Sequence, residues 1–208
     1  MDARHRKNPP RLWLMTDERV DQAALIAAAE RLPRGRAGIV FRHYGTAATE
    51  RRALFEALRK IARRRRLVLM LGGTAHEAAA WRADGAHGRD ARRAVRPMLR
   101  SRPVHDGKEA RAARRADLAF LSPLFATRSH PGERHLGRVR FAALARRSAP
   151  PVIALGGVRP CHRRLLRGIG ADGWAAIDGL TLQDQSTRGQ PRSAASFANG
   201  WCGLAAKG

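Results

Sequence analysis

Two short apolar runs in this chain end at positions where an α/β barrel often binds an anion. Residues 152–155 (VIAL) are followed by Gly156 and Gly157, and residues 173–176 (GWAA) are followed by Ile177 and Asp178. Glycines let backbone N–H groups approach phosphate oxygens, and the loops after the last two strands of an α/β barrel often form such a site. These four residues are therefore candidates for phosphate binding. A tight turn that needs a positive φ angle is the alternative explanation of the glycine pair.

The segment SPLFATRSHPGERHLG, residues 122–137, supplies a second set of polar groups. It contains Thr127, Ser129 and His130, with Arg128 and Arg134 nearby. Hydroxyl, imidazole and guanidinium groups suit an anionic ligand, and the segment is long enough to form a movable lid. A polar surface loop is the alternative.

These groups can act together only if one scaffold brings them to the same end. Short strand-like runs alternate with segments of helical period, which is typical of βα units around a parallel sheet. The strand candidates are residues 11–16, 38–43, 66–71, 85–87, 102–105, 118–122, 151–155 and 173–177. Helical periods cover residues 20–32 and the apolar face Leu54, Phe55, Leu58, Ile61 and Ala62. Eight such units predict an α/β protein with a single (β/α)8 TIM barrel, whose site lies at the carboxyl ends of the strands.

The barrel is expected to occupy residues 11–180. Residues 1–10 would form a basic N-terminal extension and residues 181–208 a C-terminal helix or tail. The dipeptide Ala-Asp recurs at 83–84, 116–117 and 171–172, each time before a strand candidate. This recurrence favours a repeated βα unit, with chance in an alanine-rich chain as the alternative.

Charge is the most prominent feature of the composition. The 208 residues carry 41 Lys and Arg against 17 Asp and Glu, a formal net charge of +24, which is compatible with nucleic acid as a partner. However, only four of the basic residues are lysine, and most of them lie in helical stretches where they form a solvated face. Aromatic residues do not interleave with the arginines, so the stacking platforms of single-strand binders are missing. Nucleic-acid binding stays as an alternative function.

The cellular setting is predicted from what the sequence lacks. Its apolar runs are far shorter than the roughly 18 residues of a membrane span, and MDARHRKNPP has no apolar signal core. We therefore expect a soluble, cytoplasmic protein with no membrane partner. Cys161 and Cys202 have no metal-ligand spacing, and we expect ordinary thiols.

Several motifs, in order and at matching spacing from about Leu12 to Leu180, resemble the family of thiamine phosphate synthases and thiazole tautomerases. LWLMTDER (12–19) is similar to the opening strand of the family, and ADGAHGR (83–89) resembles its ADGVHLGQ. SPLFATRSH (122–130) resembles GPVFPTxTK, while PVIALGGV and GADGWAAIDGL resemble PVVAIGGI and GADGVAVISAI. The resemblance implies a (β/α)8 barrel that joins a hydroxymethylpyrimidine diphosphate to a thiazole phosphate with Mg²⁺ and releases pyrophosphate.

The resemblance also implies roles for individual residues. Gly156 and Gly157 match the glycines that hold the thiazole phosphate, and Thr127 and Ser129 match a hydroxyl pair. Arg42 matches the arginine of the QLRxK motif, which meets the diphosphate. The remaining matches, His87 and His105, are histidines of the family pattern.

The departures from the family pattern affect residues that would bind the phosphate groups. Val40 and Tyr44 replace the Gln and Lys of QLRxK, and His130 replaces a lysine, so that its charge depends on pH. Asp178 replaces a serine beside the expected phosphate, where two anions would repel by on the order of 1 kcal/mol.

The implied metal site is also altered. Gly72 and Gly73 stand where the family has an Asn-Asp pair whose aspartate is a metal ligand, and Asp90 is one residue out of register with a second carboxylate. Mg²⁺ prefers a near-octahedral oxygen set with one or two carboxylates, so Asp90 alone makes a poor site.

Three functions of different classes follow. The first is a transferase of the thiamine phosphate synthase type, weak or degenerate. The second is a non-catalytic or repurposed barrel that binds a small phosphate ligand of the thiamine pathway, or a metal-free isomerase. The third is a basic nucleic-acid-binding protein.

Overall fold

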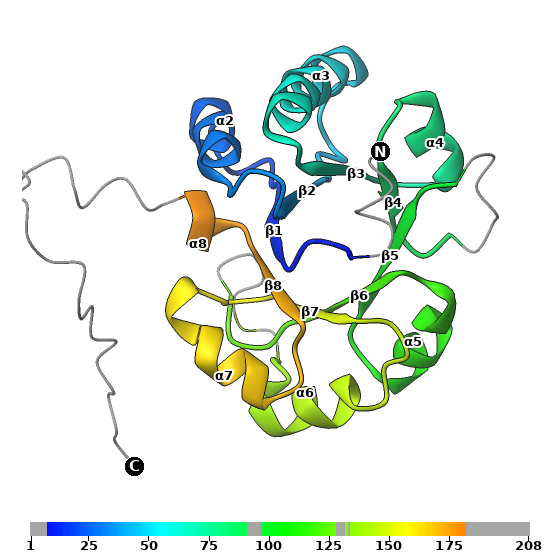
Figure 1. Ribbon diagram of the computed structural model, residues 1–208, viewed down its shortest axis with the longest axis vertical. Helices are drawn as coiled ribbons and strands as arrows, with labels where there is room; N and C mark the ends of the chain where they lie inside the picture. Colours follow the sequence, from blue (N-terminus) through cyan, green and yellow to red (C-terminus); the bar gives the residue numbers. More distant parts are fainter. Residues whose placement is uncertain (1–7, 91–96, 128–131, 133, 182–208) are drawn as a thin grey trace, which may run out of the picture.

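Eight parallel strands form a closed barrel with helices on its outside (Figure 1), in a computed structural model that describes residues 8–90, 97–127, 132 and 134–181. The strands are β1 (Leu12–Met15), β2 (Ala37–Phe41), β3 (Val68–Gly72), β4 (Gly85–His87), β5 (Leu99–Val104), β6 (Leu118–Leu121), β7 (Val152–Ala154) and β8 (Gly173–Ala176). The helices are α2 (Gln22–Arg31), α3 (Ala48–Arg65), α4 (Ala75–Ala80), α5 (Gly107–Ala112), α6 (Gly137–Ala145), α7 (Arg163–Gly168) and α8 (Asp178–Thr181), with 3-10 turns η1 (Ala113–Arg115) and η2 (Pro160–His162).

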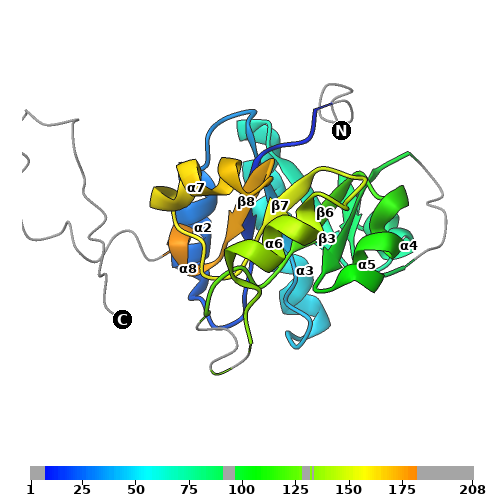
Figure 2. The same cartoon turned by 90° about the horizontal axis from the view of Figure 1, so that it is seen from below.

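The pairing of the first and last strands closes the sheet. Leu12 of β1 pairs with Ala37 of β2 on one side and with Trp174 of β8 on the other. Strand order follows chain order throughout, and the side view in Figure 2 shows the helices packed around the strands. The predicted TIM barrel is therefore confirmed.

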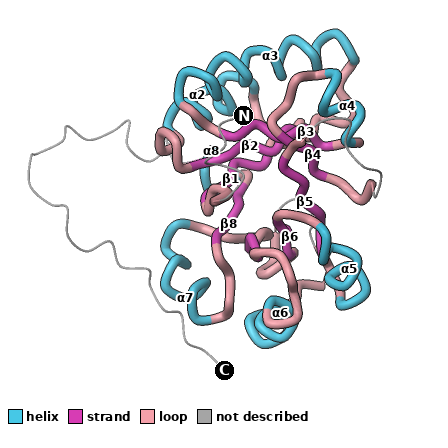
Figure 3. Tube along the Cα trace, turned by 45° about the vertical axis from the view of Figure 1, so that its right-hand side comes forward, coloured by secondary structure: helices cyan, strands magenta, loops and turns pink. Residues whose placement is uncertain are grey.

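Side chains of the strands alternate between two environments. One buried cluster draws on strands alone and fills the barrel; it includes Trp13, Met70 and Phe120, and Trp13 meets Phe120 edge to face at 5.6 Å between ring centroids. Two further clusters mix strand and helix residues, so they lie between the barrel and the outer helices, which form the cyan periphery of Figure 3. The predicted apolar face of α3 is buried here in full.

Strand β5 begins three residues before the predicted residue 102. Its sequence, LRSRPV, places arginines at alternate positions, which hides the period of a strand. Ser101 is buried and binds His87, while Arg100 and Arg102 use their guanidinium groups to donate to the carbonyls of Asp90 and Arg89. Arg100 and Arg102 are therefore partly buried and hydrogen-bonded, at strand positions where an apolar residue would be expected.

The recurring Ala-Asp dipeptide joins neighbouring strands at their amino-terminal ends. Asp84, Asp117 and Asp172 each accept a backbone N–H from the preceding strand, from Leu69, Arg100 and Val152 at 2.7 to 2.9 Å. Each aspartate N–H in turn donates to the carbonyl of that same residue at 2.8 Å. The repeat therefore closes β3 onto β4, β5 onto β6 and β7 onto β8.

The described chain ends at Thr181, in α8, so the expected C-terminal helix or tail lies outside the described residues, as does most of the N-terminal extension. Within the described part of the chain, no helix has the length and apolar character needed to cross a membrane.

Candidate active site

One hollow at the carboxyl ends of the strands lies between β7 and β8. This β7–β8 cavity, about 560 Å³ in volume, is lined by residues 125–127, 155–162 and 175–179. It therefore brings together Thr127, Gly156, Gly157, Ile177 and Asp178, which the sequence had marked as phosphate-binding candidates.

Backbone amides supply the donors of this cavity. Within the described part of the chain, the N–H groups of Gly156, Gly157, Val158 and Gly179 make no hydrogen bond. Unpaired amides at the start of a turn and at the first residues of a helix carry partial positive charge. The cavity wall can therefore accept an anion.

Glycine is required at both positions of the pair for a structural reason. Gly156 and Gly157 have φ angles of +92° and +63°, which side-chain-bearing residues rarely adopt. A Cβ at Gly156 would lie 2.7 Å from the Cα of Pro123, and one at Gly157 would collide with the carbonyl oxygen of Ala126. The Phe125 N–H also donates to the Gly156 carbonyl at 3.1 Å, which docks the loop after β6. Both explanations of the glycine pair therefore apply, because the turn needs glycine and its N–H groups are also unpaired.

Ionisable side chains of both signs lie at this cavity. Arg159 lines it, directly after the glycine turn, and its backbone N–H donates to Nδ1 of His162 at 3.2 Å. Burial and the neighbouring Arg159 lower the pKa of His162. Asp178 also lines the cavity, and its charge acts on Arg19, whose pKa is raised by Asp17 first and by Asp178 more weakly. Arg19 therefore offsets part of the charge of Asp178, and Arg159 adds a further cation to the cavity wall.

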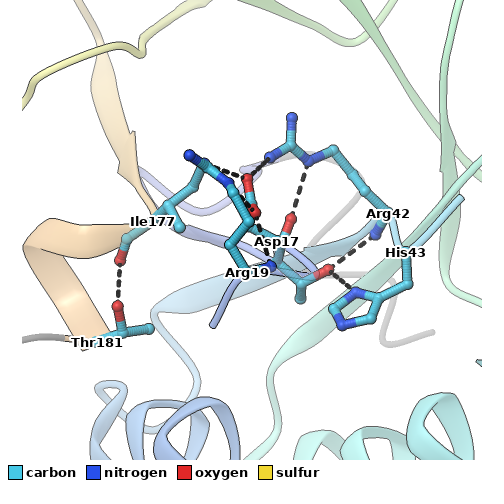
Figure 4. Close-up of polar contacts among 7 residues, drawn as sticks. Asp17, Arg19, Arg42, His43, Ile177 and Thr181 are labelled. Carbon is cyan, nitrogen blue, oxygen red and sulfur yellow. Dashed lines mark hydrogen bonds and ion pairs between the residues drawn. The ribbon is translucent and has the colours of Figure 1, made fainter. Parts of the chain in front are cut away.

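A second polar cluster joins the ends of β1 and β2 (Figure 4). Arg19 binds Asp17 through two hydrogen bonds of 2.8 Å, and Arg42 adds a longer ion pair of 3.4 Å. The hydrogen bond from Arg19 dominates and lowers the pKa of Asp17. The guanidinium Nε of Arg42 donates to the Thr16 carbonyl at 2.9 Å, so Arg42 is held over the barrel mouth. Arg42 therefore brings a second cation to a carboxylate that Arg19 already pairs.

His43 completes the cluster from below. Thr16 Oγ1 accepts the Arg42 N–H at 2.9 Å and lies 2.9 Å from Nδ1 of His43, so its own proton is free to point at the ring. Burial lowers the pKa of His43, and its ring stacks on Phe41 at 4.8 Å. A neutral His43 therefore positions the strand end.

His87 and His105, the two histidines of the motif matches, differ sharply in setting. His87 is buried, with Nδ1 2.8 Å from Ser101 Oγ, and burial lowers its pKa to about 3. His105 is exposed and binds Glu109 at 2.7 Å, and neither hollow at the strand ends is lined by it. Ser129 and His130 lie outside the described residues.

Sequence patterns missed Arg159, Arg19 and the hydrogen-bonding role of Thr16. Arg159 was detectable in principle, because it follows the glycine pair at a fixed short spacing. Arg19 was not, since its link to Asp178 joins the first and last strands of the barrel.

Comparison with known proteins defines the family. The family model described as thiamine monophosphate synthase matches residues 12–180. The chain belongs to this family. A curated relative, the thiamine-phosphate synthase of Chloroflexus aurantiacus, is 30% identical over 152 residues, which are 67% of this chain and 70% of the relative.

Solved structures agree on the fold. The thiamine phosphate pyrophosphorylase from Pyrococcus furiosus has a TM-score of 0.66 at 22% identity, over 81% of this chain and 85% of that protein. The thiamine phosphate pyrophosphorylase from Bacteroides thetaiotaomicron has a TM-score of 0.57 at 17% identity, over 88% and 89%.

Membership in the thiamine monophosphate synthase family implies Mg²⁺, an ion that needs oxygen ligands including one or two carboxylates. Gly72 and Gly73 offer no side-chain ligand, and Glu77 uses one oxygen to accept both the N–H and the hydroxyl of Thr74. Asp90 lines a separate hollow of about 150 Å³ together with Arg100 and Arg102, whose charge repels a cation. In the described ranges no group of three or more His, Cys, Asp or Glu side chains is placed to hold a metal ion. The residues present do not fit Mg²⁺.

Proposed function

We propose that this barrel is a transferase of the thiamine phosphate synthase type, which joins a hydroxymethylpyrimidine diphosphate to a thiazole phosphate with low turnover. The observation that carries the proposal is the β7–β8 cavity with its unpaired amides in a chain of this family. Its volume of about 560 Å³ lies within the roughly 300–1,000 Å³ usual for a small-molecule site.

The two substrates would occupy neighbouring parts of the barrel mouth. The amides of Gly157 and Val158, with Arg159, hold the thiazole phosphate, and Thr127 offers a hydroxyl from the β6 loop. The cluster of Arg19 and Arg42 faces the diphosphate. His130, which lies outside the described residues, carries an imidazole whose charge is present only at low pH.

Low turnover follows from the altered charges. The reaction breaks a carbon–oxygen bond to the diphosphate, so negative charge develops on the departing pyrophosphate and must be stabilised. Mg²⁺, when a protein holds it, supplies this charge stabilisation directly. Among the described residues, the guanidinium groups and hydrogen-bond donors of the chain are available for it.

A second candidate is a barrel that binds the thiazole phosphate without transfer. The pair Gly72 and Gly73 favours it, because both expected metal-site side chains are missing while the β7–β8 cavity is retained. Both candidates take a small phosphorylated ligand and differ only in turnover.

One experiment tests the transferase and separates it from the second candidate. Protein at high concentration is incubated with the pyrimidine diphosphate and the thiazole phosphate, with and without Mg²⁺, and thiamine phosphate is measured by chromatography. Slow product formation is expected, and complete absence of product rejects the transferase. In parallel, the thiazole phosphate alone should raise the melting temperature, because a ligand that binds only the folded state stabilises it.

Two alanine variants locate the ligand. Gly157→Ala should abolish the stabilisation by thiazole phosphate, because its Cβ would collide with the Ala126 carbonyl and displace the turn. Gly168→Ala is the matched control, since a Cβ there meets nothing within 4 Å and φ is not positive. Equal stabilisation of both variants by the ligand would place its phosphate elsewhere.

A further inference from the structure

The position of the expected metal ligands is filled by other side chains. A Cβ added at Gly72 would lie 2.6 Å from the hydroxyl oxygen of Tyr44 and 3.0 Å from the carbonyl oxygen of Phe41. Both Gly72 and Tyr44 depart from the family pattern, and here each occupies the space that the other leaves. A larger residue at position 72 therefore requires Tyr44 to move.

Position 73 is closed in the same way. Gly73 has a φ of +149°, and a Cβ there would lie 2.7 Å from the carboxylate Oε2 of Glu77. The Gly73 N–H donates to the His87 carbonyl at 3.0 Å, which holds the backbone. Gly88 packs so closely that a Cβ on Gly88 would lie 2.9 Å from the carbonyl oxygen of Gly73. An aspartate at 73 would be strained in this backbone.

The Arg42 and Arg51 guanidinium groups and the Glu77 carboxylate all act on the Tyr44 hydroxyl. Arg51 of α3 donates to the carbonyls of Arg42 and Gly72 at 3.2 Å each, and its guanidinium lies 4.9 Å from the centre of the Trp81 ring. Within the described chain Arg51 has no ion-pair partner, so its charge is available to the strand ends. Guanidinium groups thus stand beside β2 and β3.

Tyr44 itself is an available donor. Its hydroxyl has no hydrogen-bond partner among the described residues. The residue as a whole is 64% exposed. Burial of the hydroxyl raises the pKa of Tyr44, Arg42 and Arg51 oppose this effect, and the Glu77 carboxylate adds to it more weakly. The phenol therefore keeps its proton at neutral pH and can donate it to an anion.

We propose that the ends of β2 and β3 form an anion site that works without a divalent cation, in which the Tyr44 hydroxyl and the Arg42 guanidinium bind a phosphate or pyrophosphate group and Arg51 supplies a fixed positive charge. This inference rests on the proposed function, because it names the groups that receive the pyrophosphate of that reaction. It replaces a metal-dependent site with one built from the chain alone.

Inorganic pyrophosphate is the probe for this site. Its affinity is measured by calorimetry in EDTA and in Mg²⁺, and Mn²⁺ binding is followed by the electron paramagnetic resonance signal of the free ion. We expect binding of pyrophosphate in EDTA, no gain on adding Mg²⁺ and no loss of the free Mn²⁺ signal. Pyrophosphate binding that requires Mg²⁺, or is absent in both buffers, overturns the inference.

Variants assign the donors. Tyr44→Phe removes only the hydroxyl and should weaken pyrophosphate binding about tenfold, the size expected for one hydrogen bond to a charged group. Arg42→Gln and Arg51→Gln should weaken it as well. Arg52→Gln is the matched control, because Arg52 stacks on the same Trp81 but pairs with Glu56 on the exposed face of α3. Unchanged affinity in Tyr44→Phe, with its fold verified by circular dichroism, overturns the assignment of the hydroxyl.

Failure here is distinguishable from failure of the proposed function. Strict Mg²⁺ dependence of pyrophosphate binding would refute the anion site and leave the transferase standing. Metal-free pyrophosphate binding without any thiamine phosphate product would refute the transferase and support the anion site.

Discussion

His87 and His105 show how burial separates two residues of one type. Both match histidines of the same family pattern, and both lie at the carboxyl end of a strand. His87 faces the barrel interior against Phe120, at 5.0 Å between ring centroids, whereas His105 meets solvent and Glu109. Burial therefore ties the protonation state of His87 to folding.

Acid should destabilise the protein through His87. Its folded pKa of about 3 lies below the ordinary 6.5, so the unfolded chain binds the proton more readily and stability is lost as pH falls from 6.5 towards 3. The loss from this group is about 1.4 kcal/mol per pH unit, or about 2 kcal/mol by pH 5. Urea unfolding at pH 7 and pH 5 measures it.

Comparison of variants isolates this contribution. His87→Asn should show a shallower decline of unfolding free energy with pH than wild type, whatever its absolute stability. His76→Gln, at an exposed position of α4, is the control and should keep the wild-type slope. A slope in His87→Asn equal to that of wild type would contradict the prediction.

At the level of elements, neighbouring strands are joined in pairs by a single aspartate each. These carboxylates lie at the amino-terminal ends of the strands, opposite the active site, where barrel residues serve stability. Leu69, whose N–H binds Asp84 at 2.9 Å, is only 1% exposed, so that donor has no access to water. Strand pairing and site chemistry are therefore divided between the two ends of the barrel.

Removal of the Asp84 carboxylate should destabilise the barrel without affecting ligand binding. Asp84→Ala leaves the Leu69 N–H buried and unpaired, which costs about 1–3 kcal/mol of unfolding free energy. Asp84→Asn keeps an acceptor oxygen and should lose less. Urea unfolding gives the stability, and stabilisation by thiazole phosphate should be unchanged in both variants. Equal losses in the two variants would show that charge, rather than the hydrogen bond, matters.

On the scale of the whole molecule, a closed barrel carries a strongly positive outer shell. Helices α3, α6 and α7 present arginines to solvent around the barrel, and the 17 Asp and Glu residues balance fewer than half of the 41 Lys and Arg residues, which leaves a net charge of +24. Like charges on a compact surface repel one another and favour expansion of the chain.

Salt should therefore stabilise the fold. Raising NaCl from about 0.01 M to 0.15 M shortens the screening length from roughly 30 Å to 8 Å, which weakens long-range repulsion. We expect the unfolding free energy in urea to rise over this range. Sodium sulfate at equal ionic strength is the control, since extra stabilisation by sulfate reports anion binding rather than screening. A fall in stability with NaCl would mean that local ion pairs outweigh the net charge.

The order of apolar runs was enough to predict the barrel, because eight such runs separated by helical periods have few other ways to bury their apolar faces. All eight predicted strands are present, and the strand hardest to recognise, β5, is the one whose arginines interrupt the apolar pattern. The motifs likewise led to the β7–β8 cavity, since glycines and strand ends keep their order along the chain.

The contacts between residues that are distant in the sequence could be learned only from the folded barrel. That Tyr44 fills the place beside Gly72, that Glu77 closes Gly73 and that Arg19 links Asp17 to Asp178 all depend on contacts between different βα units. Such contacts have no spacing rule in the sequence, because barrel closure brings the strand ends together across the mouth. The structural role of Gly72 and Gly73 therefore became clear only from Tyr44 and Glu77, which lie next to them in the fold.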